Sequence, residues 1–184
     1  MIVSAAMAAK TRFFLITLVL ALVLDQVSKY WIIGEFYYGE RLSVIPGLFE
    51  LTHVRNPGGA FSLFADGSPV GRMLFFVGMT LVAIVLLLVF FRRLDPEVRL
   101  TAASLGAILG GALGNLADRL VHREVIDFLD FHIGSYYWPT FNFADSFIVV
   151  GVAILMIEMF FEPEEGSEDS DDPNAAVAKE PPPP

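Results

Sequence analysis

Four long apolar stretches dominate the hydropathy pattern of this 184-residue chain. Crossing about 30 Å of hydrocarbon takes about 20 helical residues, and each stretch is long enough to do so. Their length and continuity predict membrane-spanning helices rather than helices of a soluble domain. The predicted spans are residues 13–33, 73–91, 100–120 and 141–161.

The first stretch has a second interpretation as a cleaved signal peptide, because Lys10 and Arg12 precede its apolar run. However, Asp25 interrupts the run, which then resumes, and no small-x-small cleavage motif closes it. A retained first helix is therefore favoured.

A different pattern lies between the first two stretches. Over residues 41–64, short apolar runs are separated by the turn signals Pro46-Gly47 and Asn56-Pro57 followed by two glycines. This predicts short strands that form a small β-sheet on the membrane surface. The predicted fold is thus an all-α membrane protein, a single domain over residues 1–161 with four transmembrane helices and a small outer sheet.

Composition changes the picture only at the C-terminus. The chain is 55% hydrophobic with a net charge of −9, but residues 162–184 hold eight acidic residues and one lysine. That acidic, proline-ended segment has nothing to bury and is predicted to be a disordered cytoplasmic tail. The rest is nearly neutral, which argues against a nucleic-acid partner, and the absence of cysteine excludes disulfides and thiolate sites.

The basic residues predict the orientation. Lys10 and Arg12 precede the first span, and Arg92, Arg93 and Arg99 lie between the second and third. The positive-inside rule places both groups in the cytoplasm, which gives an N-in, C-in topology. Aromatic residues then gather at the outer boundary, as belt residues do: Tyr30, Trp31, Tyr37, Tyr38, Tyr136, Tyr137 and Trp138.

Polar residues inside the predicted spans converge on one level of the bilayer. A helical rise of about 1.5 Å per residue places Asp25 roughly 18 Å and Asn115 roughly 24 Å from the inner edge. The same rise places Asp145 roughly 10 Å below the outer boundary. Three helices therefore bring polar side chains to the outer half of the membrane, where such residues are costly and mark functional sites.

Several of these residues also have structural interpretations. Asp25 and Lys29 are spaced i, i+4 and can form a neutral pair, and Asn115 and Arg119 have the same spacing. Asp118 is more simply explained by a structural salt bridge beside Arg119.

Near the fourth span, Asn142 is a candidate helix cap. Asp145 has no basic residue within a turn on its own helix, and Asp127 is held between apolar residues. Asp145 is therefore harder to explain structurally, whereas the apolar neighbours of Asp127 would hold that residue against the membrane surface.

Small residues repeat at every fourth position of the third span, at Gly106, Gly110 and Gly114. Such a seam lets a neighbouring helix approach closely, and we expect packing rather than chemistry from it.

The candidate chemistry uses carboxylates without a metal or cofactor. The chain shows no nucleophile motif, phosphate loop or metal motif, and His53, His122 and His132 lack ligand spacing, so we expect them at the surface. Two carboxylates held close can share one proton and activate water, as in aspartic proteases. The residues alone leave the pair open among Asp25, Asp118, Asp127 and Asp145. A small transporter or a structural subunit remains an alternative.

Five segments together resemble the lipoprotein signal peptidases, the type II signal peptidases of aspartic peptidase family A8. In chain order they are DQVSK (25–29), NPGGAFS (56–62), GGALGNLADR (110–119), VIDF (125–128) and FNFAD (141–145). The chain departs from the family pattern at two positions. Gly59 stands where the family often has alanine, and Arg123 stands where it often has glycine.

The resemblance implies an endopeptidase of the bacterial inner membrane that cuts prolipoproteins before a diacylglyceryl-modified cysteine. It implies a catalytic pair of Asp127 and Asp145, an active site near the periplasmic face, a sheet that cradles the substrate, and inhibition by cyclic peptides such as globomycin. The resemblance implies no cofactor. We expect a monomer that is surrounded by membrane lipids. The residues implied to support the pair or bind substrate are Asp25, Lys29, Asn56, Asn115, Asp118, Arg119 and Asn142.

Overall fold

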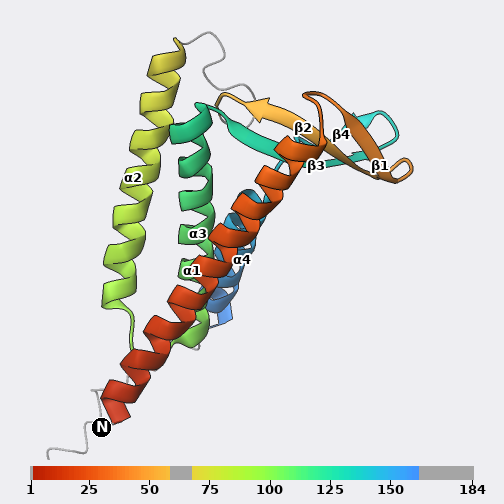
Figure 1. Cartoon of the computed structure of the whole chain (residues 1–184). Helices are drawn as coiled ribbons and strands as arrows, with labels where there is room; N and C mark the ends of the chain where they lie inside the picture. Colours follow the sequence, from red (N-terminus) through yellow and green to blue (C-terminus); the bar gives the residue numbers. More distant parts are fainter. Residues whose placement is uncertain (1, 59–67, 162–184) are drawn as a thin grey trace, which may run out of the picture.

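The computed structural model describes residues 2–58 and 68–161. Within these residues, four helices form a bundle and a four-stranded sheet lies across one end of it (Figure 1). The expected outer segment therefore falls partly outside the described residues, at 59–64, and so does the predicted tail, 162–184. The helices are α1 (Ile2–Glu35), α2 (Pro69–Arg93), α3 (Arg99–His122) and α4 (Phe143–Phe161).

All four helices are long and apolar enough to span a bilayer, as predicted. The main difference between the predicted spans and the observed helices is at the starts of α1 and α2, which begin before the apolar runs do. In α2 the reason is local: Pro69 occupies the first turn, and the Ser68 hydroxyl accepts a hydrogen bond from Gly71 N at 3.0 Å. Hydropathy detects apolar length, whereas caps set where a helix begins.

Helix α3 is the centre of the bundle and packs against α1 along the predicted glycine seam. A Cβ atom at Gly106 would collide with the Phe14 carbonyl oxygen, and one at Gly110 would lie 2.5 Å from the Leu18 carbonyl oxygen. On another face of α3, a Cβ at Gly111 would collide with the Ala144 carbonyl of α4. The expected close helix approach is therefore confirmed, and it involves two neighbours.

Replacing Gly110 by alanine should destabilise the bundle, because overpacking a close contact costs about 1–3 kcal/mol. Thermal unfolding in detergent measures the effect as a lower Tm. Gly78→Ala is the matched control, since no atom lies within 4 Å of its added Cβ, and alanine favours the helix by roughly 0.5–1 kcal/mol. A Gly110→Ala protein as stable as Gly78→Ala would contradict this packing.

The N-terminal part of α1 is joined to the C-terminal end of α2. Lys10 Nζ donates to the carbonyl oxygens of Leu94 at 2.7 Å and Phe91 at 3.3 Å, and the ring of Phe91 stacks on Phe14. A cation is favourable at a helix C-terminus, where carbonyl groups are unpaired. Lys10 thus lies at the same end of the bundle as Arg92 and Arg93 of α2 and Arg99 of α3, opposite the sheet (Figure 1).

The sheet is antiparallel with the order β1-β2-β3-β4. Its strands are β1 (Arg41–Ile45), β2 (Phe49–Asn56), β3 (Val125–Ile133) and β4 (Tyr136–Tyr137). The first two confirm the strands expected after residue 41. The last two are missing from the sequence prediction, which is wrong there, although polar residues recur within the apolar run of β3 as in a half-buried strand.

The junction between the sheet and α1 is a small apolar core. Ile32 and Phe36 at the end of α1 pack with Ile126 and Phe128 of β3. His53 is buried here too, with Nδ1 3.0 Å from the Phe36 carbonyl oxygen, so its predicted surface position is wrong. This core fixes β3 relative to the helices.

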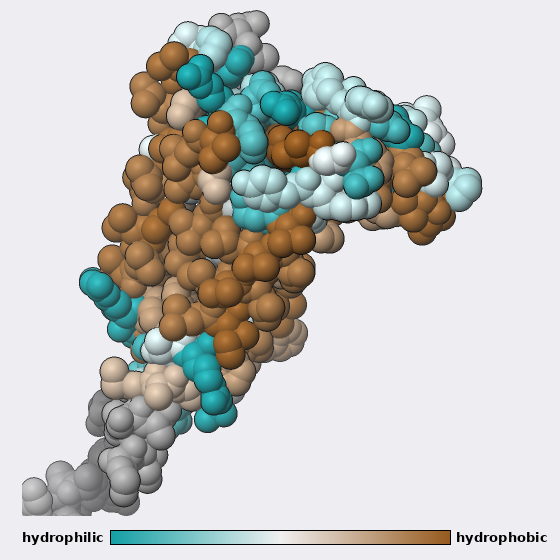
Figure 2. Space-filling view, in the orientation of Figure 1, coloured by the Kyte–Doolittle hydropathy of each residue, from teal (hydrophilic) through white to brown (hydrophobic). Residues whose placement is uncertain are grey.

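On the face shown in Figure 2, hydrophobic residues dominate the helices and hydrophilic residues gather over the sheet end. This distribution is the one expected when helices lie in hydrocarbon and a sheet lies at its boundary with water.

Arg123, which ends α3, has a positive φ of 65°. Glycine is the residue that adopts this left-handed conformation without steric cost. The departure at position 123 therefore concerns a helix end, and the backbone keeps the conformation that glycine would favour.

Candidate functional site

Asp127 and Asp145 reach one pocket from different elements. Asp127 lies on β3, and Asp145 lies in the first turn of α4. The pocket has a volume of about 1010 Å³. Its lining comprises Val54, Arg55, Asn56, Pro57, Asn115, Arg119, Val125, Asp127, Trp138, Pro139, Thr140, Phe141, Asp145, Ser146, Val149 and Val150.

The Asp127 carboxyl group is buried and receives one hydrogen bond on each oxygen. Asn142 Nδ2 donates to Oδ1 at 2.7 Å, and Asn56 Nδ2 donates to Oδ2 at 3.0 Å. Burial, together with the nearby charge of Asp145, raises the pKa of Asp127 to about 7, although the two amides oppose the shift. Asp127 therefore holds its proton at pH values where an ordinary aspartate is ionised.

Asp145 is oriented by a reciprocal cap at the start of α4. Asn142 Oδ1 accepts from Asp145 N at 3.0 Å, and Asp145 Oδ2 accepts from Asn142 N at 3.3 Å. Asn115 Nδ2 of α3 donates to the other oxygen, Oδ1, at 2.8 Å. The expected capping role of Asn142 is confirmed, and the same residue contacts both carboxylates.

Lys29 of α1 lies next to the site and contacts residues on α1 and α3. Its Nζ lies 2.8 Å from Asp25 Oδ2 and 2.9 Å from Asp118 Oδ2, and it donates to Asn115 Oδ1 at 2.9 Å. All four side chains are buried. Asn142 Nδ2 also donates to Asn115 Oδ1, at 3.2 Å, so Lys29 and Asn142 together turn the Asn115 amide nitrogen toward Asp145.

The two carboxylates bound to Lys29 also fix the elements that carry Asp127 and Asp145. Asp25 Oδ1 accepts from Ala144 N at 2.9 Å, which ties down the start of α4. Asp118 Oδ2 accepts from Ile126 N at 3.1 Å, which ties down β3 one residue before Asp127. The convergence expected from helical depth is therefore present, from α1, α3 and α4 alike.

The partner expected for Asp118 is wrong. Asp118 does form a structural ion pair, but its partner is Lys29 on another helix rather than the adjacent Arg119. The Arg119 guanidinium instead lies over the Phe76 ring of α2, 5.2 Å from its centroid, and donates to the Asn115 carbonyl oxygen at 3.1 Å. Its side chain lines the pocket.

Sequence reasoning assigned no role to several contributors. Gln26 donates to Asp25, Asp118 and the Gly114 carbonyl oxygen, at 3.1 to 3.2 Å. Its position beside Asp25 gives no signal for this bridge to α3. Trp138 and Phe141 line the pocket, whereas aromatic composition alone suggested for Trp138 only a membrane boundary.

Among the described residues, no group of three or more His, Cys, Asp and Glu side chains is arranged to hold a metal ion. The arrangement can instead hold a proton on one carboxyl group beside a second carboxylate. Such a pair can polarise a carbonyl group and activate a water molecule.

Comparisons with known proteins agree over most of the chain. Residues 17–161 match the family described as signal peptidase (SPase) II. The chain is 43% identical to the lipoprotein signal peptidase of Syntrophus aciditrophicus, covering 84% of this chain and 96% of that protein. It is 46% identical to the lipoprotein signal peptidase of Serratia proteamaculans, covering 79% and 85% respectively.

The fold has a solved counterpart as well. A bacterial membrane enzyme determined by the in meso method at 1.9 Å resolution superposes with a TM-score of 0.72. That structure is 32% identical to this chain and covers 82% of it, with 94% of its own length matched. This chain therefore belongs to the signal peptidase II family, aspartic peptidase family A8, and is a multi-pass membrane protein.

Proposed function

We propose that this protein removes signal peptides from diacylglyceryl-modified prolipoproteins by hydrolysing the peptide bond before the lipidated cysteine. One observation carries the proposal: Asp127 and Asp145 line one pocket at the end of the bundle that carries the sheet, and Asn142 contacts both. Membership of the signal peptidase II family supports the substrate class.

In the proposed mechanism the two aspartates have different roles. Asp145 accepts a proton from water, whose oxygen attacks the scissile carbonyl carbon, while Asp127 donates its proton to the carbonyl oxygen. When the tetrahedral intermediate collapses, the C–N bond breaks and the leaving amine takes the proton held by Asp145. The proton on the former carbonyl oxygen returns to Asp127, which restores the starting state.

The remaining polar residues orient this pair. Asn56 and Asn142 hold the Asp127 carboxyl group, and Asn115 holds Asp145. Lys29, Asp25 and Asp118 form the buried base that positions these amides and backbones. Arg119 lines the pocket and is placed to bind the substrate.

The proposed location follows from the lipid on the substrate. Each buried CH₂ contributes about 0.8 kcal/mol, so the lipidated cysteine stays in the membrane and the protease must act at the boundary. Positive charges at the end opposite the sheet support a cytoplasmic N-terminus and a site at the periplasmic face of the inner membrane.

Cleavage should fall as the pH rises above about 7. The raised pKa of Asp127 keeps this group protonated below that pH and lets it act as the acid, and deprotonation removes the donor. The measurement is kcat/KM for a diacylglyceryl prolipoprotein peptide between pH 5 and 9, at constant detergent and salt. A rate that stays level up to pH 9 would contradict an acid role for Asp127.

The proposed function is tested by adding the purified chain, in detergent, to a diacylglyceryl prolipoprotein and to its unlipidated form. We expect cleavage before the lipidated cysteine only, unchanged by EDTA. Loss of cleavage with EDTA and recovery with a divalent metal would reject the two-aspartate mechanism. Absence of cleavage, with ion flux in liposomes instead, would favour a transporter.

A further inference from the structure

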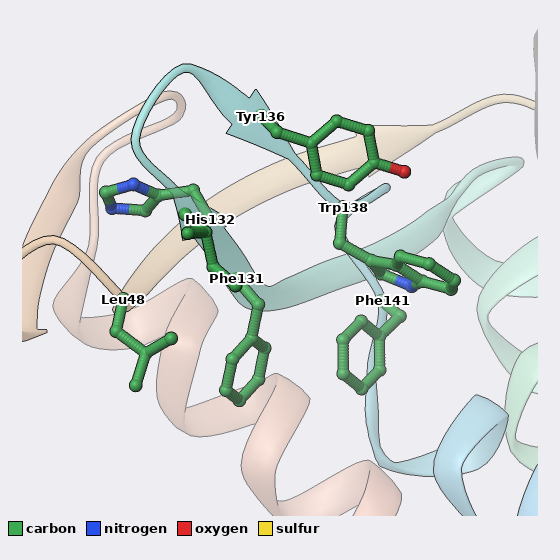
Figure 3. Close-up of a pocket in the computed structure, with 7 residues that line it drawn as sticks. Leu48, Phe131, His132, Tyr136, Trp138 and Phe141 are labelled. Atoms are coloured by element: carbon green, nitrogen blue, oxygen red, sulfur yellow. The ribbon is translucent and has the colours of Figure 1, made fainter.

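A second, apolar pocket adjoins the one that contains the two aspartates. Its volume is about 420 Å³, and its lining residues come from the end of β3, from β4 and from the segments beside them. It is lined by Leu48, Phe131, His132, Ile133, Tyr136, Trp138 and Phe141 (Figure 3). Trp138 and Phe141 also line the larger pocket, so two side chains form walls of both.

The two pockets are adjacent, and each has lining residues on β3. Side chains alternate along a strand, so Asp127, Leu129 and Phe131 point to the same face. At the far end of this face, Phe131 stacks on Phe49 and on Phe141, with centroid distances of 4.6 and 5.9 Å. At about 3.3 Å per residue, Phe131 lies about 13 Å from Asp127 along the strand.

Part of the lining of the apolar pocket faces the helices. In Figure 3, Leu48, Phe131 and Phe141 point to the side on which α1 and α4 run. Ile133 and Tyr136 at its edge are well exposed. Large exposed apolar side chains beside a transmembrane bundle are expected where lipid covers them.

We propose that this pocket binds an acyl chain of the substrate's diacylglyceryl group and thereby positions the lipidated cysteine for cleavage. The proposal rests on the proposed function, which places the lipid next to Asp127 and Asp145. An acyl chain that starts beside Asp127 and passes the shared walls Trp138 and Phe141 enters the pocket next to Phe131. The shared walls favour the substrate's own lipid over a phospholipid of the surrounding bilayer, because only the substrate's lipid is tethered at the neighbouring pocket.

The pocket would favour cleavage by holding the substrate in place, and not by the free energy of transferring its acyl chain out of the bilayer. Hydrocarbon gains little free energy on leaving a bilayer for an equally apolar site, so packing supplies the specificity. A palmitoyl chain is long enough to reach the pocket from Asp127, and a butyryl chain is not. The expected consequence is a preference for long-chain substrates that depends on the pocket.

Leu48→Trp tests this preference, because a larger side chain would fill the pocket from its edge. We expect kcat/KM for a dipalmitoylglyceryl peptide to fall about tenfold, equivalent to about 1.4 kcal/mol, with no change for the dibutyrylglyceryl peptide. Leu42→Trp is the matched control, since Leu42 is a similarly exposed leucine of the sheet outside the pocket. Equal effects of Leu48→Trp on the two peptides, or no effect on either, would overturn the proposal.

Photo-crosslinking of the unmodified protein provides a second test that does not depend on a variant. A reduced-amide analogue of the substrate, with a diazirine at one acyl terminus, should label the lining residues Phe131, Ile133 or Tyr136. A phospholipid with the same diazirine should label the helix surfaces, and excess substrate should not change that pattern. Labelling of the pocket by the phospholipid that resists competition by substrate, or analogue labelling only on the helices, would overturn the proposal.

The two proposals fail in distinguishable ways. If the acyl site is wrong, the long and short substrates respond alike to Leu48→Trp, while cleavage remains. If the proposed function is wrong, the unmodified protein does not cleave either lipidated peptide.

Discussion

Asp127→Asn and Asp145→Asn should each lower kcat/KM for prolipoprotein cleavage by about 10⁴-fold, the size of loss seen when a catalytic group is removed. Asparagine keeps the shape of the side chain but neither accepts the proton of water nor donates one. The double variant should lose little more than either single variant, because residues that act as a unit are not additive. The measurement is cleavage of a diacylglyceryl peptide by each purified protein, with folding checked by thermal unfolding.

Asp130→Asn is the matched control for this result. Asp130 is a buried aspartate on the same strand, but it points to the opposite face, where it pairs with Arg41. We expect its cleavage rate to stay close to that of the unmodified protein. If Asp118→Asn abolished cleavage while Asp127→Asn did not, the catalytic pair would have to be reassigned.

The second large effect is expected on stability, at Lys29. Lys29→Met removes the cation between Asp25 and Asp118 and leaves two carboxylates buried without their partner. Removing one member of a buried ion pair costs about 3–5 kcal/mol, so the variant should unfold at a clearly lower temperature in detergent. Cleavage should fall too, because Asn115 would lose one of the two hydrogen bonds that turn its amide toward Asp145.

A second substitution separates charge from packing at this site. Lys29→Met with Asp118→Asn removes one of the two uncompensated carboxylates, so its Tm should lie above that of Lys29→Met alone. Equal Tm values for the two proteins would show that lost packing, rather than buried charge, causes the instability.

Much of the fold could be predicted from sequence because lipid imposes a simple rule. An apolar run of sufficient length is a helix, and a helix has a fixed rise, so the meeting of Asp25, Asn115 and Asp145 followed from counting residues. Strand β3 escaped prediction because its apolar residues alternate imperfectly, as in the run from Phe128 to Leu129. Its pairing with β2 is a long-range contact that no local pattern encodes.

The candidate site could be predicted only in part for the same reason. Local spacing found the Asp25–Lys29 pair and the cap formed by Asn142. It could not show that Lys29 also binds Asp118 on another helix, or that one asparagine contacts both Asp127 and Asp145. Those contacts depend on how the strand lies on the bundle, and the choice of pair therefore required the family resemblance.

The glycine seam of α3 sets a boundary for engineering a more robust enzyme. Gly-to-Ala changes are a common route to stiffer helices, and Gly78 on α2 has room for one. A methyl group at Gly114 would instead collide with the Asp25 carboxylate that Lys29 binds. A stabilisation programme should therefore leave the seam unchanged and direct its substitutions to the lipid-facing surface of α2.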